Sequence, residues 1–448
     1  MIRNGNLICG FLLVWSGPAA AQNSPSRVQA LLRQMSLTEK VSLLHGSRDP
    51  NAGYWPGLPG LGIPPVRFAD GPPGVNVNRD ATAMPAPVGL AATFDEEAAR
   101  RYGAVMGHEA RALEQNVLLA PHVNIVRDPG FRRNHTAFSE DPYLSARLAA
   151  AQIAGIQSQG VMAQVKHLAG YNGSENVVID ERTLHEIYLP AFEAAVHAGV
   201  ASVMCAYNQV NSVWSCENAV LQNEILRGQW GFRGFVTSDW GAVHGPEAIT
   251  RGLDLEMPGR QLAGRRGPYF TEALRTAVES GAIPREAVDG AVARILEQME
   301  RFGLLGQRAG VRPRRIDVAG DAKIARRIAE ESAVLLKNES RALPLTAADL
   351  DSVVLIGPTA GQLAAGFMGE RAYGFPERLM SPLEALRWIA PRSRIAWSPG
   401  VDLTGVSIPA AALSHDVRPG LMRRRAESTE VQVDESLDFQ RADALPPG

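Results

Sequence analysis

One carboxylate directly follows an apolar run in this sequence. Asp239 comes after residues 234–237 and Ser238, and Trp240 comes next. A carboxylate so placed can attack the anomeric carbon of a glycoside and form a glycosyl ester, which divides one difficult step into two. Trp240 would supply an apolar wall on which a pyranose ring stacks. The alternative is that Asp239 only caps a following helix.

Charged side chains follow other apolar runs as well. Lys166 and His167 end one run, Asp70 ends another, and Arg133 lies in a polar segment. Hydrogen bonds from charged groups are strong, and a guanidinium donates in a planar fork, so these residues suit the recognition of sugar hydroxyls. The alternatives are a surface lysine beside a structural histidine, an Asp-Gly-Pro turn and a loop arginine.

Signals for other chemistries are missing from the sequence. Its histidines, such as His122, His135 and His185, lack the spacing of metal ligands, so we expect no metal site. No glycine-rich nucleotide motif follows an apolar run, and no G-x-S-x-G elbow occurs, so we expect no cofactor. The net charge of −2 leaves no basic excess for nucleic acid.

The N-terminal residues have the pattern of a signal peptide. Arg3 precedes a short apolar run at residues 7–15, and Ala19 to Ala21 fits an A-x-A cleavage site. We therefore expect residues 1–21 to be removed from an exported, periplasmic or secreted protein that carries no further membrane segment. The alternative is a buried N-terminal helix.

Two cysteines remain in the expected mature chain. Cys205 and Cys216 flank a turn-rich loop. In an exported protein such a pair is a candidate disulfide, and the alternative is two unpaired, small apolar side chains.

The candidate site residues are far apart in the sequence, so they can form one site only if the fold brings the strand ends together. Between about residues 60 and 260, a short apolar run, a polar end and a helical stretch recur. The strand-like runs are 66–69, 89–92, 117–120, 163–165, 201–205, 234–237 and 253–255. Helices are expected after the capping box at 36–39 and over 139–158, 183–197, 284–302 and 322–336. This alternation predicts an α/β protein with a parallel sheet, and so many units favour a (β/α)8 TIM-type barrel over an open doubly wound sheet.

In a barrel, the C-terminal ends of the strands share one rim, so distant residues such as Asp70 and Asp239 would line one pocket. We expect the barrel to span residues 22–306. A linker and helix at 307–330 would lead into the first part of an α/β-sandwich domain at 331–404, which includes a buried strand at 352–356.

Several of these stretches, in the same order, resemble glycoside hydrolase family 3, which contains β-glucosidases and related exo-glycosidases. The matching segments are 67–72, 124–129, 133–134, 139–142, 165–167, 202–208 and 234–240, within roughly residues 35–405. The resemblance implies that Asp239 is the nucleophile and that Trp240 lines the pocket. It implies that the residues binding the terminal sugar are Asp70, Arg133, Lys166, His167 and Tyr207.

The sequence departs from the family pattern near these motifs. His135 and Thr136 stand where many relatives have an aromatic residue and a glutamate. The loop after His167 is short, lacks the family's sugar-binding arginine, and contains no histidine at 169–175, which disfavours the subgroup that acts on N-acetylglucosaminides.

The family's acid/base glutamate is not found in this chain. It belongs to a stretch resembling Glu-x-Glu-Gly-x-Asp-Arg, and Glu370, Glu377 and Glu384 are not in such a motif. Residues 405–448 resemble the start of an inserted β-sandwich-like module, so we expect a C-terminally truncated chain.

The resemblance implies a retaining, exo-acting β-glucosidase whose partner is a short β-linked gluco-oligosaccharide or glycoside. A β-xylosidase or a broader β-glycosidase is one alternative. An alternative of another class is a non-catalytic, glycan-binding protein that lacks the acid/base.

Overall fold

The computed structural model describes most of the chain in several stretches. These are residues 26–48, 52–77, 79–265, 267–306, 315–346, 349–361, 374–375 and 378–400, with short strands between 408 and 437. The expected signal peptide, most of the linker, Glu370 and Glu377 lie outside the described residues. Within them, no helix has both the length and the apolar character needed to cross a membrane.

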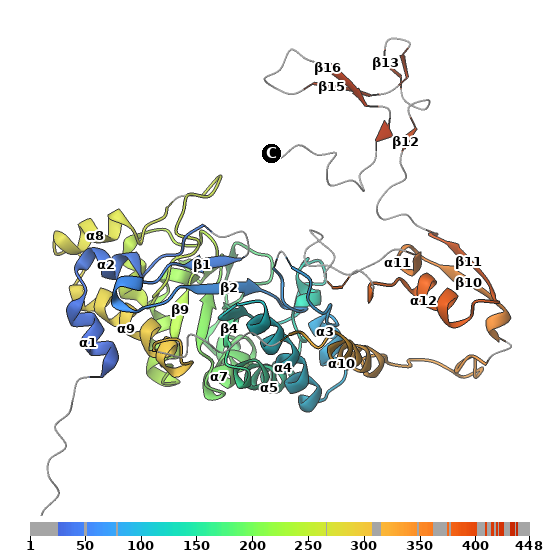
Figure 1. Ribbon diagram of the computed structural model, residues 1–448, viewed down its shortest axis with the longest axis horizontal. Helices are drawn as coiled ribbons and strands as arrows, with labels where there is room; N and C mark the ends of the chain where they lie inside the picture. The colour runs from blue at the N-terminus through green and yellow to red at the C-terminus, as the bar shows by residue number, and fades with distance from the viewer. Residues whose placement is uncertain are drawn as a thin grey trace, which may run out of the picture.

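The centre of the molecule is a six-stranded sheet in the order β1-β2-β3-β4-β6-β9 (Figure 1). Its strands are β1 (Gly53–Trp55), β2 (Val66–Asp70), β3 (Val117–Leu119), β4 (Met162–Leu168), β6 (Ser202–Cys205) and β9 (Phe235–Thr237). All pairs from β2 to β9 are parallel, whereas β1 is antiparallel to β2.

Isolated bridges continue the hydrogen bonding past both edges of this sheet. Thr237 bridges Leu255, and the next residue, Glu256, bridges His45. Two residues further on, Ser47 bridges Tyr54 in β1. The ladder therefore runs from β9 round to β1, so the sheet curls on itself.

Helices cover the outer side of the curled sheet (Figure 1). They include the long helices α4 (Glu96–Ala112), α5 (Pro142–Ser158) and α9 (Arg285–Arg301), together with the shorter α7 (Pro190–His197). Every residue of β3, β4, β6 and β9 is buried, as expected for a parallel sheet covered on both faces. The predicted α/β class is confirmed, while the (β/α)8 barrel followed by an α/β sandwich stays a prediction.

Shorter elements complete this part of the fold. They are α1 (Arg27–Gln34), α2 (Leu37–Ser42), η1 (Pro59–Leu61), α3 (Pro87–Ala91), η2 (Asn134–Thr136), β5 (Asn176–Val177), α6 (Glu181–Thr183), η3 (Leu184–Tyr188), β7 (Gln209–Val210), β8 (Val213–Trp214), η4 (Ser215–Glu217), η5 (Val220–Gln229), η6 (Pro246–Arg251) and α8 (Glu272–Glu279). The predicted capping box is confirmed, because Ser36 and Glu39 exchange both hydrogen bonds at the start of α2.

The strand predicted at 89–92 is wrong, because these residues belong to α3 and its end. Pro87 stands in the first turn of this helix, where its fixed φ is compatible with the helical backbone and its missing N–H costs nothing. A short apolar run does not distinguish a strand from a buried helical turn. The run at 253–255 contributes one isolated bridge, from Leu255 to Thr237, and forms no named strand.

The second part of the chain begins with α10 (Val318–Glu331). This helix starts earlier than the predicted 322–336 because Asp317 caps it through Gly320 N, and it ends five residues before the predicted end. A parallel pair follows, β10 (Ser352–Ile356) with β11 (Arg394–Ser398), and its helices are α11 (Pro358–Gly361) and α12 (Pro382–Ile389).

The strand predicted at 352–356 is present as β10, but the prediction that it is buried is wrong. Val354 is 63% exposed and Ile356 is 76% exposed. Their apolar pattern is typical of a covered strand, but the described residues leave these side chains uncovered.

The C-terminal stretch contains only short antiparallel pairs among the described strands. The pairs are β12 (Ile408–Pro409) with β17 (Ser436–Leu437), β13 (Ser414–His415) with β14 (Arg418–Pro419), and β15 (Leu421–Arg424) with β16 (Val431–Asp434). The predicted β-sandwich-like module and the domain boundaries stay predictions.

Candidate active site

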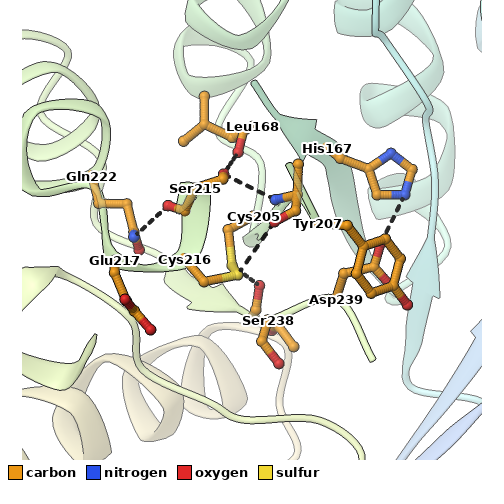
Figure 2. Close-up of a disulfide and its surroundings, with 12 residues drawn as sticks. His167, Leu168, Cys205, Tyr207, Ser215, Cys216, Glu217, Gln222, Ser238 and Asp239 are labelled. Atoms are coloured by element: carbon orange, nitrogen blue, oxygen red, sulfur yellow. Dashed lines mark hydrogen bonds and ion pairs between the residues drawn. A yellow bond between two sulfur atoms is a disulfide. The ribbon is translucent and has the colours of Figure 1, made fainter. Parts of the chain in front are cut away.

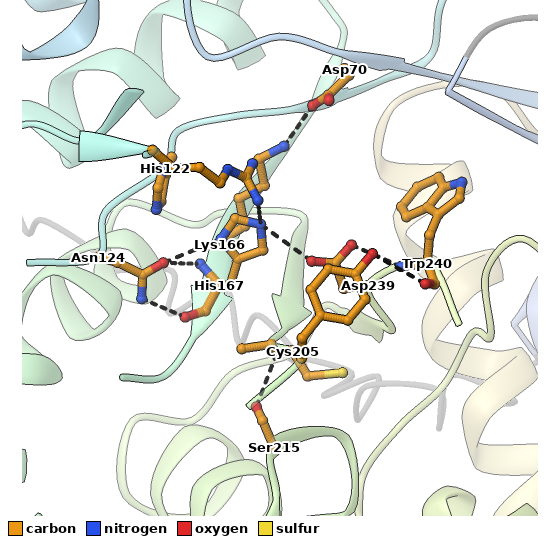
Figure 3. Close-up of polar contacts among 12 residues, drawn as sticks. Asp70, His122, Asn124, Lys166, His167, Cys205, Ser215, Asp239 and Trp240 are labelled. Atoms are coloured by element: carbon orange, nitrogen blue, oxygen red, sulfur yellow. Dashed lines mark hydrogen bonds and ion pairs between the residues drawn. The ribbon is translucent and has the colours of Figure 1, made fainter. Parts of the chain in front are cut away.

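Asp239 lies just past the end of β9, where the parallel strands end (Figure 3). It is 7% exposed, and its Oδ1 accepts a hydrogen bond of 2.8 Å from Trp240 N in a turn instead of capping a helix. Its Oδ2 lies 3.4 Å from His167 Nε2 and has no well-aligned hydrogen-bond donor among the described residues. Burial raises the pKa of Asp239, which the positive charges of Arg133 and Lys166 offset only in part. The nearby Tyr207 hydroxyl also helps to offset this rise in the pKa of the carboxyl group.

Lys166, in β4, forms an ion pair with Asp70 at the end of β2. The distance from Lys166 Nζ to Asp70 Oδ1 is 2.6 Å, and the lysine side chain is 3% exposed. Burial opposes the ionisation of Asp70, but the charge and hydrogen bond of Lys166 outweigh it, so the pKa of Asp70 is lowered. Asp70 is therefore an ionised acceptor beside a charged donor, which suits recognition of sugar hydroxyls.

Asn124 fixes the position of His167. It accepts a 2.9 Å hydrogen bond from His167 N and donates a 2.8 Å one to His167 O. Asn124 Oδ1 also lies 3.2 Å from Nδ1 of the ring, and an amide oxygen only accepts, so Nδ1 carries the proton. Burial and the charge of Arg133 lower the pKa of His167 far below its usual range. The ring is therefore neutral, and its Nε2 lone pair faces Arg133 Nη1 at 3.4 Å.

Arg133 reaches the pocket from the segment before η2. Its guanidinium lies 5.6 Å from the ring centre of Tyr171, and that ring is 4.8 Å from the His167 ring. His122 packs edge-on against His167, with ring centres 5.0 Å apart, and its Nδ1 is 2.7 Å from Thr136 Oγ1. Thr136, one of the two departures from the family pattern, thus supports the wall behind His167.

The supporting residues Asn124, His122 and Tyr171 were not predicted as part of the site. Asn124 stands in a motif that carries the family resemblance, and Tyr171 lies in the loop after His167. These positions, in or beside the recognised motifs, were the sequence signal that could have identified them as site residues. Their roles depend on contacts across the pocket, which sequence spacing does not show.

Tyr207 and Trp240 form the aromatic wall beside Asp239. Tyr207 OH donates to Trp240 O at 3.1 Å, and Trp240 Nε1 donates to Ala52 O at 2.9 Å. Burial and the charge of Asp239 raise the pKa of Tyr207, so its phenol keeps its proton. The structure thus places all the predicted binding residues around Asp239.

A disulfide joins Cys205 and Cys216 behind this wall (Figure 2). Their Cα atoms are 5.1 Å apart, and both residues are fully buried. Ser215, beside Cys216, accepts a 3.0 Å hydrogen bond from Ala206 N. The disulfide and this hydrogen bond hold the two residues that precede Tyr207.

Replacing both Cys205 and Cys216 with alanine is expected to lower the free energy of unfolding by roughly 2–3 kcal/mol, because the open loop gains conformational entropy in the unfolded chain. Urea unfolding of the two proteins measures the difference. The control is a thiol titration of the denatured, unreduced chain, in which Cys9 is the one cysteine outside the pair. Titration of Cys205 and Cys216 as free thiols would contradict the disulfide.

Glu256 is a second buried carboxylate, and backbone donors of a later segment occupy it. Its Oε2 accepts hydrogen bonds from the backbone N–H groups of Tyr269, at 2.7 Å, and Phe270, at 2.5 Å. Burial outweighs both hydrogen bonds and raises the pKa of Glu256 to about 7. Glu256 thus anchors the segment that follows it along the chain.

The raised pKa of Glu256 predicts a pH-dependent stability. A carboxyl group whose pKa is raised on folding stabilises the fold below its unfolded pKa, and this contribution is lost as the pH rises through about 7. Thermal unfolding from pH 4.5 to 8 should therefore show Glu256→Gln gaining stability relative to the wild type as the pH rises. A difference that does not change with pH would contradict the assigned pKa.

The carboxylates that were considered for catalysis differ in their hydrogen-bond and ion-pair partners. Asp239 has an oxygen without a well-aligned donor among the described residues, whereas Asp70 is held ionised by Lys166. Glu384, in the second part of the chain, accepts from Ser381 N and Ser381 Oγ at the start of α12. Among the described residues, Asp239 is therefore the carboxylate best placed to act as a nucleophile.

A buried carboxylate, charged donors and an aromatic wall at the strand ends of an α/β protein are the features of a glycoside hydrolase. The family model described as the glycosyl hydrolase family 3 N terminal domain matches residues 60–298, more than half of the 448 residues. The chain belongs to glycosyl hydrolase family 3.

Similar proteins include several β-glucosidases. The chain is 39% identical to a β-glucosidase of Rhizobium radiobacter over 376 residues, which are 80% of this chain and 44% of that protein. It is 39% identical to thermostable β-glucosidase B of Acetivibrio thermocellus over 351 residues, with 74% and 44% covered. The chain thus spans about half the length of these relatives.

The similar solved structures are also β-glucosidases. DesR, a β-glucosidase from Streptomyces venezuelae in complex with D-glucose, superposes with a TM-score of 0.80 and 44% identity, covering 89% of this chain and 54% of that one. β-Glucosidase 3B from Thermotoga neapolitana in complex with glucose has a TM-score of 0.73 and 33% identity, with 82% and 54% covered.

Proposed function

We propose that this chain carries the catalytic barrel of an exported, retaining β-glucosidase that removes terminal non-reducing β-glucosyl residues from short oligosaccharides or glycosides. The observation that carries the proposal is Asp239, which is buried at a strand end and whose Oδ2 has no well-aligned hydrogen-bond donor among the described residues. The glucosidase relatives, two of which were solved with glucose, support the sugar. The curled sheet supports a barrel with one antiparallel strand, and the disulfide supports export.

The proposed reaction divides the work between two sides of the pocket. Asp70 and Lys166, with Arg133 and His167, bind the hydroxyls of the terminal glucose. Asp239 Oδ2 attacks the anomeric carbon, the bond to the leaving oxygen breaks, and a glucosyl ester forms. Water then releases glucose and regenerates the carboxylate.

A retaining mechanism also needs a proton donor about 5–5.5 Å from the nucleophile. Asp70 does not suit this role because Lys166 lowers its pKa, and Glu384 is engaged in a helix cap. We therefore place the acid/base outside the described residues. The same observation favours a second candidate function, a glycan-binding protein without turnover.

The test compares three substrates on the full chain. Dinitrophenolate leaves without protonation, so 2,4-dinitrophenyl β-glucoside should be cleaved, and azide should replace the second-step water and yield β-glucosyl azide. Cellobiose should be a poor substrate, because acid–base catalysis typically contributes about 10²–10⁴-fold.

Each other outcome has a defined meaning. Glucose binding without dinitrophenolate release would identify a glycan-binding protein. Faster cleavage of the matching β-xyloside would identify a β-xylosidase. Cellobiose turnover near the common enzyme value of about 10 s⁻¹ would show that the chain contains its acid/base.

A further inference from the structure

An exposed guanidinium covers the aromatic wall of the pocket. Arg265 Cζ lies 4.6 Å from the ring centre of Tyr207, the residue that donates to Trp240 O. Arg265 is exposed, whereas Tyr207 is partly buried. A cation over an aromatic face is a favourable contact. Arg265 therefore places a positive charge on the solvent side of the Tyr207 ring.

The segment that carries Arg265 is held against the site. Arg265 Nη1 donates to Gly241 O at 3.4 Å. Gly241 has a φ of +72°, and a Cβ there would lie 3.2 Å from Leu262 Cδ1 and 3.4 Å from Arg265 Cγ. Further along the chain, Glu256 holds the backbone of Tyr269. The position of Arg265 is thus set by packing on both sides of it.

Arg265 lies on the Trp240 side of Asp239, because its guanidinium contacts Gly241, which follows Trp240, and Tyr207, which donates to Trp240 O. Figure 3 shows Trp240 on one side of Asp239, with His167 and Lys166 on the other. Because an exo-acting enzyme holds the terminal sugar inside its pocket, the leaving group extends outward to solvent. Arg265, exposed over the Tyr207 ring, would then face the leaving group.

The charge of Arg265 has no acidic partner among the residues that the structure describes, where its polar contacts are the Tyr207 ring and Gly241 O. A guanidinium binds a carboxylate through two parallel hydrogen bonds, which are stronger than those to neutral acceptors. We propose, on the basis of the function proposed above, that Arg265 determines specificity on the leaving-group side and selects β-glucosides whose aglycone carries a carboxylate.

The test measures binding, so it does not require the acid/base. Phenyl 1-thio-β-glucoside and 4-carboxyphenyl 1-thio-β-glucoside resist hydrolysis and differ only in the carboxylate. Calorimetry on the full chain should show tighter binding of the carboxyphenyl compound. Arg265→Ala should reduce the ratio of the two affinities roughly tenfold, as expected for loss of a charged hydrogen bond.

Arg260→Ala removes another exposed arginine of the same segment and serves as the matched control, in which the ratio should be kept. Arg265→Lys should retain part of the preference, and 1 M salt should weaken it. An equal ratio in the wild type and Arg265→Ala would overturn the inference. Failure to bind either thioglucoside or glucose would instead overturn the proposed function, and the inference with it.

Discussion

Asp239→Asn is expected to slow dinitrophenolate release from 2,4-dinitrophenyl β-glucoside by about 10⁴-fold or more, as is usual when a nucleophile is removed. The substituted amide does not form the glucosyl ester, and the substrate already has a good leaving group, so the loss falls on bond formation at the anomeric carbon. A stopped-flow measurement of the first turnover isolates this step.

The covalent intermediate can be located directly. A 2-deoxy-2-fluoro-β-glucosyl donor with a dinitrophenolate leaving group should label the wild type once, and peptide mass spectrometry should place the label on Asp239. A label on Asp70 or Glu256 would contradict the assignment.

The loss of activity should occur in a folded protein. Burial raises the pKa of Asp239, so a neutral amide at this position should not lower the melting temperature. Glu256→Gln is the matched control, because Glu256 is also a buried carboxylate but accepts hydrogen bonds from backbone N–H groups of a later segment. It should keep the rate of dinitrophenolate release.

Asp254→Asn is expected to lower the free energy of unfolding by about 3–5 kcal/mol, the usual cost of leaving a buried charge without its partner. Asp254 is fully buried between two arginines. Its Oδ1 lies 2.7 Å from Arg294 Nη2, and its Oδ2 lies 2.5 Å from Arg227 Nη2 and 2.7 Å from Val236 N. An amide group would turn N–H donors toward a guanidinium.

This cluster ties β9 to the helices that cover it. Val236 is in β9, Arg227 is in η5, and Arg294 is in α9. Asp254 therefore supports the strand that ends next to Asp239 without contacting the pocket. Urea unfolding measures the loss, and it should persist in 0.5 M salt because buried charges are weakly screened.

Glu272→Gln is the control for the Asp254 experiment. Glu272 pairs with Arg275 on the surface, where its side chain is 71% exposed, and it should have little effect because solvent screens exposed pairs. Equal effects of the two substitutions would contradict the buried role of Asp254.

The sequence alone predicted the α/β class. It also predicted that the candidate active site lies at the C-terminal ends of the parallel strands. The class is confirmed, because alternating apolar runs are a local pattern. The structure places the predicted polar residues together at the strand ends, because parallel strands bring their C-terminal ends to one edge of the sheet. The local patterns were insufficient where a covering layer decides the outcome. Residues 89–91 belong to the helix α3, and Val354 and Ile356 are exposed.

What only the tertiary structure decided is the chemical state of each residue in the pocket. Asp70 and Lys166 are 96 positions apart, and their pairing keeps Asp70 ionised. His167 is neutral because burial and Arg133 lower its pKa, whereas burial raises the pKa of Asp239. Residue types and their order are written in the sequence. A pKa depends on the water excluded and the charges gathered around each group, and those are set by contacts between distant segments of the folded chain.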